Sequence, residues 1–284
     1  MMSPDSPIFS RIIKKAIRLR LYSRRFHAFG VGAPKSGTTS IAAMLEEQYR
    51  SLHEPDAEET IENILLNAQG SLSRETLTRY VASQDSARRL EMNSSSFNVY
   101  LLPCLLELFP HSKYILTIRD CYSWLDSLLG HVTFRTTSST WERFRDFRFD
   151  RSARYHKEEK HLKEKGFFPL DGYLGYWSWH NQYVLDTVPP ERLLVLRTDE
   201  ISTRIDEIAC FLGVDASSIQ SSRSRGNIAH QKGDFVSSLP SRFLVERATE
   251  HCAALMTKYY PGKLQGIDDR LAEDPTINPR TSCP

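Results

Sequence analysis

A short glycine loop between a strand-like and a helix-like segment is the feature that most constrains this chain. Residues 26–33 form an apolar run with the length of a buried strand, and residues 38–49 repeat apolar side chains at helical spacing. Residues 32–40, between and overlapping them, read Gly-Ala-Pro-Lys-Ser-Gly-Thr-Thr-Ser. A strand, a tight loop and a helix in this order aim backbone N–H groups and the positive end of a helix dipole at one point, which then binds phosphate. We therefore expect a phosphate site here; a plain turn between two core elements is the alternative.

The lysine of this loop does not stand where ATP-binding loops have it. In the pattern G-x-x-x-x-G-K-[ST], the lysine follows the second glycine and reaches the β and γ phosphates. Here Thr38 occupies that position, and the lysine is Lys35, between Gly32 and Gly37. We expect Lys35 to lie beside the outermost group of a shorter, 5′-monophosphate-like chain. The loop thus suits one phosphate that carries a transferable group.

Residues 34–39, Pro-Lys-Ser-Gly-Thr-Thr, resemble the 5′-phosphosulfate loop of the sulfotransferases that use 3′-phosphoadenosine 5′-phosphosulfate (PAPS). That loop commonly reads P-K-[ST]-G-T-[TS]. The resemblance implies an enzyme that releases 3′-phosphoadenosine 5′-phosphate (PAP) as its product. It also implies that PAPS is bound by Lys35, Ser36, Gly37, Thr38, Thr39 and Ser40.

A second motif resembles the same family. Its members bind the 3′-phosphate of the donor with an arginine at the end of a strand and a serine eight residues later, on the next helix. Arg119 ends the strand-like run 113–119, and Ser127 follows at that spacing. An arginine fork can hold a phosphate through two charge-assisted hydrogen bonds. Taken alone, Arg119 could equally be a surface ion-pair residue.

The segment 51–56, Ser-Leu-His-Glu-Pro-Asp, corresponds to a family segment such as K-E-P-H-F-F, whose glutamate is the catalytic base. The resemblance assigns this role to Glu54, although the aromatic pair of the family is missing and Asp56 stands where a histidine often lies. His53 is an alternative base, because the ordinary pKa of histidine is close to neutrality. If this segment is a strand, its adjacent side chains point to opposite faces, so we expect only one of the two to face the site. Two ordinary loop residues are the third alternative.

Two weaker matches follow. Residues 90–97 resemble the E-K-[ST]-P-x-Y segment of the family, but Met92 replaces its lysine, which argues against a glycosaminoglycan-like acceptor. Arg225 and Gly226 resemble the basic loop that closes over the 3′-phosphate, and Lys232-Gly233 is a competing candidate.

The remaining pattern predicts an α/β fold, with one domain over residues 26–260 built on a central parallel sheet flanked by helices. Strand-like and helix-like segments alternate along the chain, as they do in such sheets. The expected strands are 27–33, 88–92, 113–119 and 192–197. The expected helices are 38–49, 98–108, 121–130, 174–187 and 199–212.

Three regions differ from this pattern. Residues 1–25 predict a basic amphipathic helix, which either contacts an anionic membrane surface or packs on its own domain with a solvated basic face. Residues 131–183 mix aromatic and basic side chains, and we expect an acceptor-binding or lid region there, with an ordinary aromatic core as the alternative. The proline-containing tail 261–284 is expected to be irregular.

Composition and charge restrict the remaining function classes. A net charge of +2 gives no general attraction to nucleic acid, and the histidines show no H-E-x-x-H pattern, so we expect no metal. Five scattered cysteines without C-x-x-C indicate reduced thiols. No segment reads as a secretory signal or a membrane span, so we expect a cytoplasmic protein, membrane-associated if the basic helix binds lipid.

The sequence thus predicts a PAPS-dependent sulfotransferase that acts on a hydroxyl or amine of a small-molecule, glycan or lipid acceptor. In this mechanism Glu54 or His53 takes the acceptor proton, and Lys35 stabilises the charge on the leaving oxygen. A P-loop kinase or nucleotide-binding module is one alternative, supported by the strand, loop and helix alone. A non-catalytic scaffold that binds the donor is another. The sequence predicts neither the acceptor nor the oligomeric state.

Overall fold

The computed structural model of the chain describes residues 23–132, 138–149, 154–225, 236 and 238–264. Nearly all of the predicted basic helix, most of the predicted tail and Lys232-Gly233 lie outside these residues. The described residues fall into two compact units. The first comprises residues 23–118 and 183–225, and the second comprises the rest.

The first unit contains a sheet of five parallel strands in the order β2-β3-β1-β4-β5. Because β1 lies between β3 and β4, the chain builds the sheet outward from β1 in both directions. In parallel sheets, the carboxyl ends of the strands at such a reversal leave a crevice in which ligands bind. The strands are β1 (Ala28–Gly30), β2 (Ser51–His53), β3 (Met92–Ser94), β4 (Lys113–Ile118) and β5 (Leu193–Arg197).

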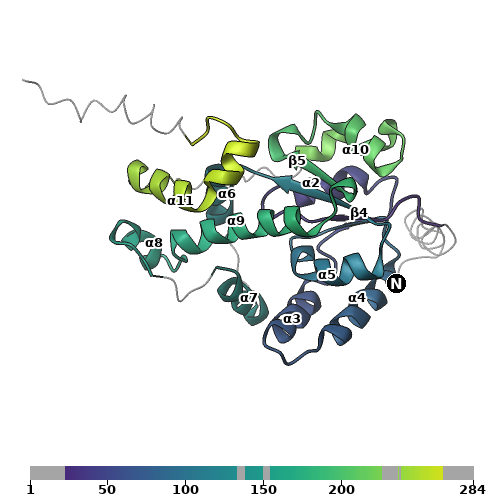
Figure 1. The fold of residues 1–284 in the computed structure, drawn as a ribbon, viewed down its shortest axis with the longest axis horizontal. Coiled ribbons are helices and arrows are strands. Elements are labelled where there is room, and N and C mark those ends of the chain that lie inside the picture. The colour runs from purple at the N-terminus through teal and green to yellow at the C-terminus, as the bar shows by residue number, and fades with distance from the viewer. Residues whose placement is uncertain (1–22, 133–137, 150–153, 226–235, 237, 265–284) are drawn as a thin grey trace, which may run out of the picture. The chain divides into compact units, whose positions relative to one another are not determined.

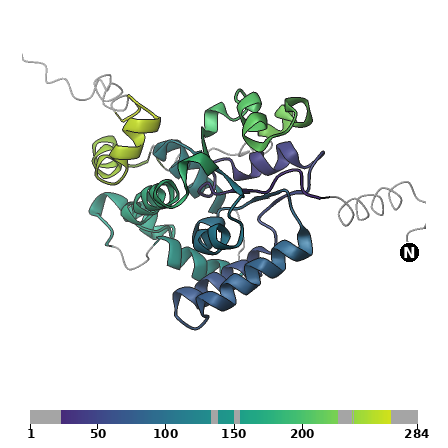
Figure 2. The same ribbon diagram turned by 45° about the vertical axis from the view of Figure 1, so that its right-hand side comes forward.

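Helices cover both faces of this sheet (Figures 1 and 2). α2 and α10 lie on one face, and α3, α4 and α5 lie on the other. The alternation of side chains along β1 explains these two layers, because Ala28 packs with α2 and α10 while Phe29 stacks on Tyr114 and Phe109 on the opposite face. The helices are α2 (Thr38–Leu45), α3 (Ala57–Ala68), α4 (Arg74–Arg88), α5 (Asn98–Leu108) and α10 (Ile205–Leu212).

The described part of the second unit is helical. Trp124 and Trp177 are fully buried in it, and the ring of Phe149 packs 4.7 Å from that of Tyr173. Aromatic side chains of this size bury about 150–250 Å² each, so they contribute strongly to the core of this unit. Its helices are α6 (Cys121–Val132), α7 (Ser139–Phe149), α8 (Lys160–Glu164), most of α9 (Leu170–Thr187) and α11 (Ser241–Tyr259).

A charged cluster around Asp171 ties three segments of the second unit together. Asp171 lies in the first turn of α9 and accepts hydrogen bonds from Nε2 of His156 at 2.9 Å and from Nε2 of His251 at 3.0 Å. Nη1 of Arg247 lies 3.2 Å from the same carboxylate. Burial acts to raise the pKa of Asp171, but the two histidine hydrogen bonds and the arginine charge outweigh it and lower the pKa.

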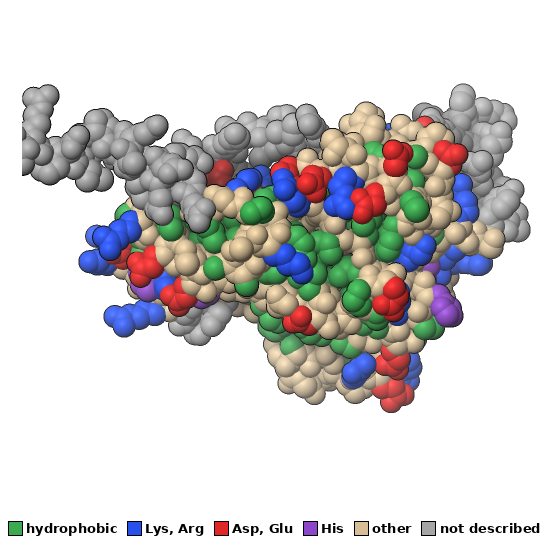
Figure 3. Space-filling view, turned by 45° about the horizontal axis from the view of Figure 1, so that its top comes forward, with side chains coloured by type: hydrophobic (Ala, Val, Ile, Leu, Met, Phe, Trp, Pro, Cys, Tyr) green, Lys and Arg blue, Asp and Glu red, His purple; other side chains and the backbone are tan. Residues whose placement is uncertain are grey.

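Two buried thiols lie in the same unit. Cys121 begins α6, and Cys252 lies on α11. The hydrogen bond with the Cys252 thiol, together with burial, raises the pKa of Cys121 well above its ordinary value. On the face drawn in Figure 3, acidic and basic side chains of the described residues are interspersed, in keeping with the small net charge.

The predicted α/β class, with a central parallel sheet and flanking helices, is confirmed. The predicted helix 98–108 has the bounds of α5, and the predicted strands 113–119 and 192–197 each differ from β4 and β5 by one residue. The predicted helices 121–130 and 174–187 correspond to α6 and α9, which extend two residues further at the end of α6 and four at the start of α9.

Other boundaries were wrong. β1 ends at Gly30 rather than at residue 33, because the chain leaves the sheet there to form the loop. The strand expected at 88–92 lies instead at β3, because α4 continues to Arg88 and Arg89 then takes a left-handed conformation with φ of 49°. The helix predicted at 38–49 ends at Leu45, and the helix predicted at 199–212 begins only at Ile205, after a 3-10 turn. The helices α3, α4, α7, α8 and α11 were not predicted.

Candidate active site

The loop after β1 has the backbone of an anion cradle. Lys35 has a φ of 65° and Gly37 a φ of 115°, so the chain turns sharply twice before α2 begins at Thr38. Gly37 is the N-cap, and as a glycine it has no side chain with which to cap the first turn of α2. The first N–H groups of a helix have no partner within the helix, and together with the helix dipole they favour an anion. The predicted strand, loop and helix are thus present.

Buried hydrogen bonds fasten this loop to the sheet. The Ser36 hydroxyl donates to the carbonyl of Ala33 at 2.7 Å and lies 3.0 Å from Oγ1 of Thr117 on β4. Oγ1 of Thr198, just after β5, contacts the carbonyl oxygens of Ser36 and Ile118. Ser36 is only 1% exposed, so its hydroxyl stabilises the loop through these internal hydrogen bonds.

Gly32 is required by close packing at the base of the loop. A Cβ atom at this position would lie 2.1 Å from Oγ1 of Thr117 and 2.5 Å from Oγ of Ser36. It would also lie 2.9 Å from the backbone oxygen of Thr117, within the central part of the sheet. The loop can approach β4 this closely only without a side chain at residue 32.

His53 and Glu54 lie together beside the loop. Nε2 of His53 is 3.1 Å from Oγ1 of Thr38 and 3.2 Å from Oγ1 of Thr39. Oε1 of Glu54 lies 4.0 Å from the same ring nitrogen. The condition for expecting only one of the two at the site is not met, because β2 ends at His53 and Glu54 has a left-handed φ of 47°, which breaks the alternation of a strand.

A buried serine holds the Glu54 carboxylate. Oγ of Ser96 donates a hydrogen bond to Oε1 of Glu54 at 2.8 Å, and Ser96 is 1% exposed. The backbone N–H of Glu54 donates to the carbonyl of Ser94 at 3.1 Å. These contacts fix a carboxylate next to the loop. Ser96 was not among the residues predicted from the sequence, although the serine run 94–96 lies within the motif at residues 90–97.

The electrostatic setting of His53 follows from its neighbours. Burial lowers its pKa most strongly, the Glu54 carboxylate raises it, and the Lys35 ammonium lowers it; the net effect is a lowered pKa. His53 is therefore neutral at pH 7, with one ring nitrogen able to accept a proton.

Backbone strain gathers in these two segments. Four non-glycine residues of the described chain have a positive φ, and three of them are Lys35, Glu54 and Asp56. Residues in such conformations cost about 1–3 kcal/mol each and are found mostly where function requires them. Asp56 points toward α4, where it forms an ion pair with Arg88, with 2.6 Å between Oδ2 and Nε.

Arg119 and Ser127 belong to the second unit. Arg119 directly follows β4, its Nε donates to Oγ of Ser123 at 3.0 Å, and its carbonyl accepts from Nε1 of Trp177 at 3.0 Å. Burial lowers the pKa of Arg119 most strongly, while Asp120 acts to raise it. Ser127 lies one helical turn after Ser123 on the same face of α6. The contact between Arg119 and Ser123 was not predicted from the sequence, although their spacing of four residues was the available signal.

The remaining predicted site residues are only partly described. Ser40 lies in the first turn of α2 and is half-buried. A 3-10 helix ends at Arg225, but the side chain of Arg225 and the whole of Gly226 lie outside the described residues. Met92, which stands where the family motif has a lysine, is fully buried in the core beneath α2.

Two further findings concern metals and membranes. Within the described ranges, no group of three or more His, Cys, Asp or Glu side chains could hold a metal ion. None of the helices formed by the described residues is both long enough and apolar enough to cross a membrane.

Comparison with known proteins gives a family match. A family model described as a sulfotransferase domain matches residues 27–220, which is more than half of the chain. Among curated proteins compared by sequence, none matches.

Solved structures with a similar fold are distant in sequence. A sulfotransferase from Alicyclobacillus acidocaldarius is 17% identical, with 82% of this chain and 96% of that chain covered and a TM-score of 0.48. The sulfotransferase domain of the Synechococcus PCC 7002 olefin synthase is 19% identical, with 89% and 95% covered and a TM-score of 0.41. Mouse sulfotransferase SULT7A1 complexed with PAP is 13% identical, with 90% and 92% covered and a TM-score of 0.41.

Proposed function

The chain belongs to the sulfotransferase family, and we propose that it transfers the sulfuryl group of PAPS to a hydroxyl or amine of a small-molecule, glycan or lipid acceptor. One observation carries this proposal. The imidazole of His53 and the carboxylate of Glu54 lie beside Thr38 and Thr39, at the start of the helix that follows the phosphate loop. This places groups that can take a proton next to the loop that we propose to bind the donor.

The loop is proposed to bind the 5′-phosphosulfate. Its contribution consists of the N–H groups at the uncapped start of α2 and the ammonium group of Lys35. Arg119, with Ser127 and the newly identified Ser123, is proposed to bind the 3′-phosphate. A charge-assisted hydrogen bond of this kind contributes about 1.5–3 kcal/mol, so Arg119→Ala is expected to weaken PAP binding by roughly 10- to 150-fold.

Transfer forms a bond between the acceptor oxygen and sulfur and breaks the bond between sulfur and the 5′-phosphate oxygen, which keeps the electron pair. The acceptor proton must therefore leave, and negative charge develops on the phosphate oxygen. We propose that Glu54 takes the proton, since Ser96 fixes its position, and that Lys35 stabilises the developing charge. His53 is the second candidate base, because its lowered pKa leaves it neutral.

The test is PAP release from PAPS, measured by liquid chromatography with a panel of alcohols, phenols, amines and oligosaccharides. Glu54→Gln is expected to lower the turnover rate by about 10²- to 10⁴-fold without changing PAP affinity. Glu47→Gln makes the same chemical change at an exposed position just after α2 and serves as the matched control. If His53→Gln reduces turnover in this way while Glu54→Gln does not, the base is His53.

The alternatives predict different results. A P-loop kinase or nucleotide-binding module would bind ATP with magnesium, but Thr38, at the position of the usual lysine, contacts His53 instead. A non-catalytic scaffold would bind PAP and release none from PAPS with any acceptor. PAP release that depends on Glu54 or His53 would exclude both.

A further inference from the structure

Burial and three neighbouring groups act on Arg119, which we propose to bind the 3′-phosphate. Burial lowers its pKa most strongly, while Asp120, Tyr260 and Asp126 act to raise it, Asp120 the most of the three. A carboxylate that stabilises a guanidinium also repels a phosphate bound to that guanidinium, because both anions are negatively charged. A second cation beside Asp120 therefore favours binding of the phosphate.

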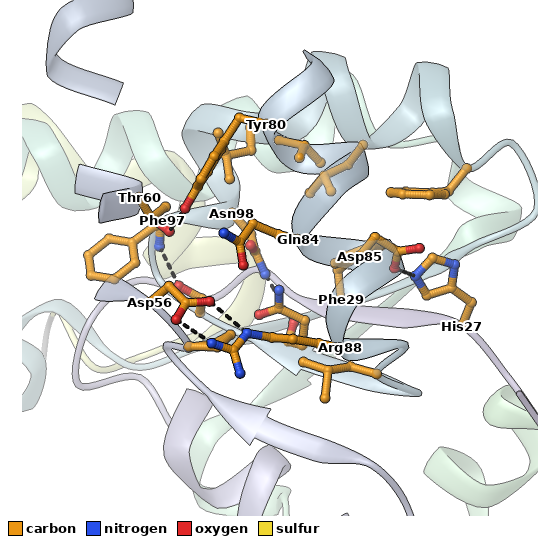
Figure 4. A pocket seen from close by; sticks show the side chains of 18 residues that line it. His27, Phe29, Asp56, Thr60, Tyr80, Gln84, Asp85, Arg88, Phe97 and Asn98 are labelled. Atoms are coloured by element: carbon orange, nitrogen blue, oxygen red, sulfur yellow. Dashed lines mark hydrogen bonds and ion pairs between the residues drawn. The ribbon is translucent and has the colours of Figure 1, made fainter. Parts of the chain in front are cut away.

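Arg119 is held through a hydroxyl, unlike a structural arginine of the first unit. In the pocket drawn in Figure 4, Asp56 and Arg88 point toward each other, and the carboxylate accepts hydrogen bonds from Nε and Nη2 of the guanidinium. Such a fork matches the charge of the arginine with that of one carboxylate. At Arg119, by contrast, Nε donates to Oγ of Ser123 at 3.0 Å, and this hydroxyl donates to Oδ2 of Asp120. A hydroxyl thus stands between Nε of this guanidinium and the carboxylate.

The Asp120 carboxylate is also bound by a lysine of the segment that follows α11. Asp120 is only 7% exposed, and its Oδ1 accepts the N–H of Ser123 in the first turn of α6 at 3.0 Å. Its Oδ2 lies 3.3 Å from Nζ of Lys263. A buried carboxylate is stabilised by such a cation. The side chain of Lys263 is 49% exposed, so a ligand at this surface meets its charge as well.

A tight turn determines the position of Lys263. α11 ends at Tyr259, and the next four residues, 260–263, read Tyr-Pro-Gly-Lys. The N–H of Lys263 donates to the carbonyl of Tyr260 at 3.1 Å, and Gly262 has a φ of 82°. Proline in the second place and glycine in the third are the residues that a type II turn favours. Nζ of Lys263 also lies 5.0 Å from the centre of the Tyr260 ring, at the distance of a cation–π contact.

We propose that Lys263 raises the affinity of the chain for the 3′-phosphate of the donor by neutralising Asp120. The inference rests on the proposed function, because it adds a residue to the same donor site. With Lys263 beside Asp120, Arg119 keeps more of its attraction for a doubly charged phosphate. Lys263 acts through Asp120 and is therefore a positioning residue rather than a catalytic one.

Titration calorimetry of the full chain with PAP and with adenosine 5′-monophosphate, which lacks the 3′-phosphate, tests this proposal. Lys263→Gln is expected to weaken PAP binding about three- to tenfold and to leave the affinity for the monophosphate unchanged. The loss should shrink at an ionic strength of about 1 M, where the Debye length is about 3 Å. Lys263→Arg keeps the charge and should keep the PAP affinity.

Lys258→Gln is the matched control. Lys258 is exposed in the last turn of α11, and its Nζ lies 5.1 Å from the centre of the Tyr259 ring, so the same change removes a lysine with a similar aromatic contact. We expect it to leave PAP affinity unchanged. Asp120→Asn supplies a second comparison, because Lys263 should be dispensable once the carboxylate is gone. In that background Lys263→Gln is expected to change PAP affinity by less than about twofold.

The results distinguish failure of the Lys263 assignment from failure of the proposed function. If the unaltered chain binds PAP and Lys263→Gln binds it equally well, only the Lys263 assignment is overturned. An equal loss for PAP and the monophosphate, or a loss that persists in full in the Asp120→Asn background, overturns it as well. If the unaltered chain binds no PAP, the proposed function fails and the Lys263 assignment fails with it.

Discussion

Gly32→Ala is the substitution whose effect follows most directly from the geometry of the loop. The added Cβ would lie 2.1 Å from Oγ1 of Thr117, a contact that rotation of the threonine side chain can relieve. The contact of 2.9 Å with the backbone oxygen of Thr117 cannot be relieved in this way, because β5 holds β4 in register at this residue. The loop itself must therefore move away from the strand.

The size of the effect is the sum of two contributions. Overpacking of a buried site costs about 1–3 kcal/mol. Displacement of the loop also breaks the hydrogen bond between the Ser36 and Thr117 hydroxyls, at 3.0 Å, which contributes about 0.5–1.5 kcal/mol. We expect the free energy of unfolding to fall by about 1.5–4.5 kcal/mol, which corresponds to a fall of roughly 3–18 °C in Tm. Because Ser36 would shift with the loop, PAP affinity should fall as well.

Urea unfolding followed by circular dichroism measures the first effect, and titration with PAP measures the second. Gly175→Ala is the matched control, because Gly175 lies inside α9 and its added Cβ would meet no atom nearer than 3.9 Å. There we expect the opposite sign, a gain of about 0.5–1 kcal/mol, since alanine favours a helix. A Gly32→Ala protein as stable as the unaltered chain, with the same PAP affinity, would refute the reasoning.

Three other predictions follow from the titrating groups. Because burial lowers the pKa of His53, unfolding takes up a proton at this residue below about pH 6.5, and its contribution to stability falls as the pH falls through that range. Lys35→Ala should raise the pKa of His53 in an NMR titration, and an unchanged pKa would contradict the stated effect of the Lys35 charge. The lowered pKa of Asp171 contributes stability that is present above about pH 3.9 and is lost as the pH falls through the folded-state pKa. Asp171→Asn should therefore lower the midpoint of urea unfolding at pH 7, and should change that midpoint little in strong acid. Among the described cysteines, the exposed Cys210 should react with iodoacetamide at pH 8 well before Cys121, because the neighbouring Cys252 thiol and burial raise the pKa of Cys121. Equal labelling rates of the two peptides in mass spectrometry would contradict this prediction.

The phosphate loop could be predicted from the sequence because its determinants are local. Glycines at two fixed positions and a lysine between them specify both the backbone and its charge, and neighbouring apolar runs specify the strand and the helix. The sheet order and the pairing of Ser36 with Thr117 could not be predicted in this way, since these residues are far apart in the chain.

The wrong predictions around β3 and α4 arose because β3 contains polar residues and α4 has almost no apolar stripe. β3 contains Asn93 and Ser94, and its buried Ser94 donates to the carbonyl of Thr38 at 2.8 Å, so an apolar pattern does not reveal it. α4 buries only Leu77 and Val81 in fifteen residues, which leaves almost no apolar stripe. Its start did carry a signal, because Ser73 caps it by accepting from the N–H of Thr76.

The position of Glu54 was not predictable from side-chain pattern. A non-glycine residue with a positive φ is uncommon, and no property of the segment 51–56 specifies it. With this backbone angle, Oε1 of Glu54 lies 4.0 Å from Nε2 of His53.

The central claim is that the loop and Arg119 bind PAPS rather than ATP. Titration calorimetry of the full chain with PAP, and separately with ATP and magnesium, tests it most directly. We predict saturable binding of PAP, weakened in Lys35→Ala and Arg119→Ala, and no binding of ATP under the same conditions. Binding of ATP with magnesium in the absence of PAP binding would contradict the account and favour a nucleotide-binding or kinase function.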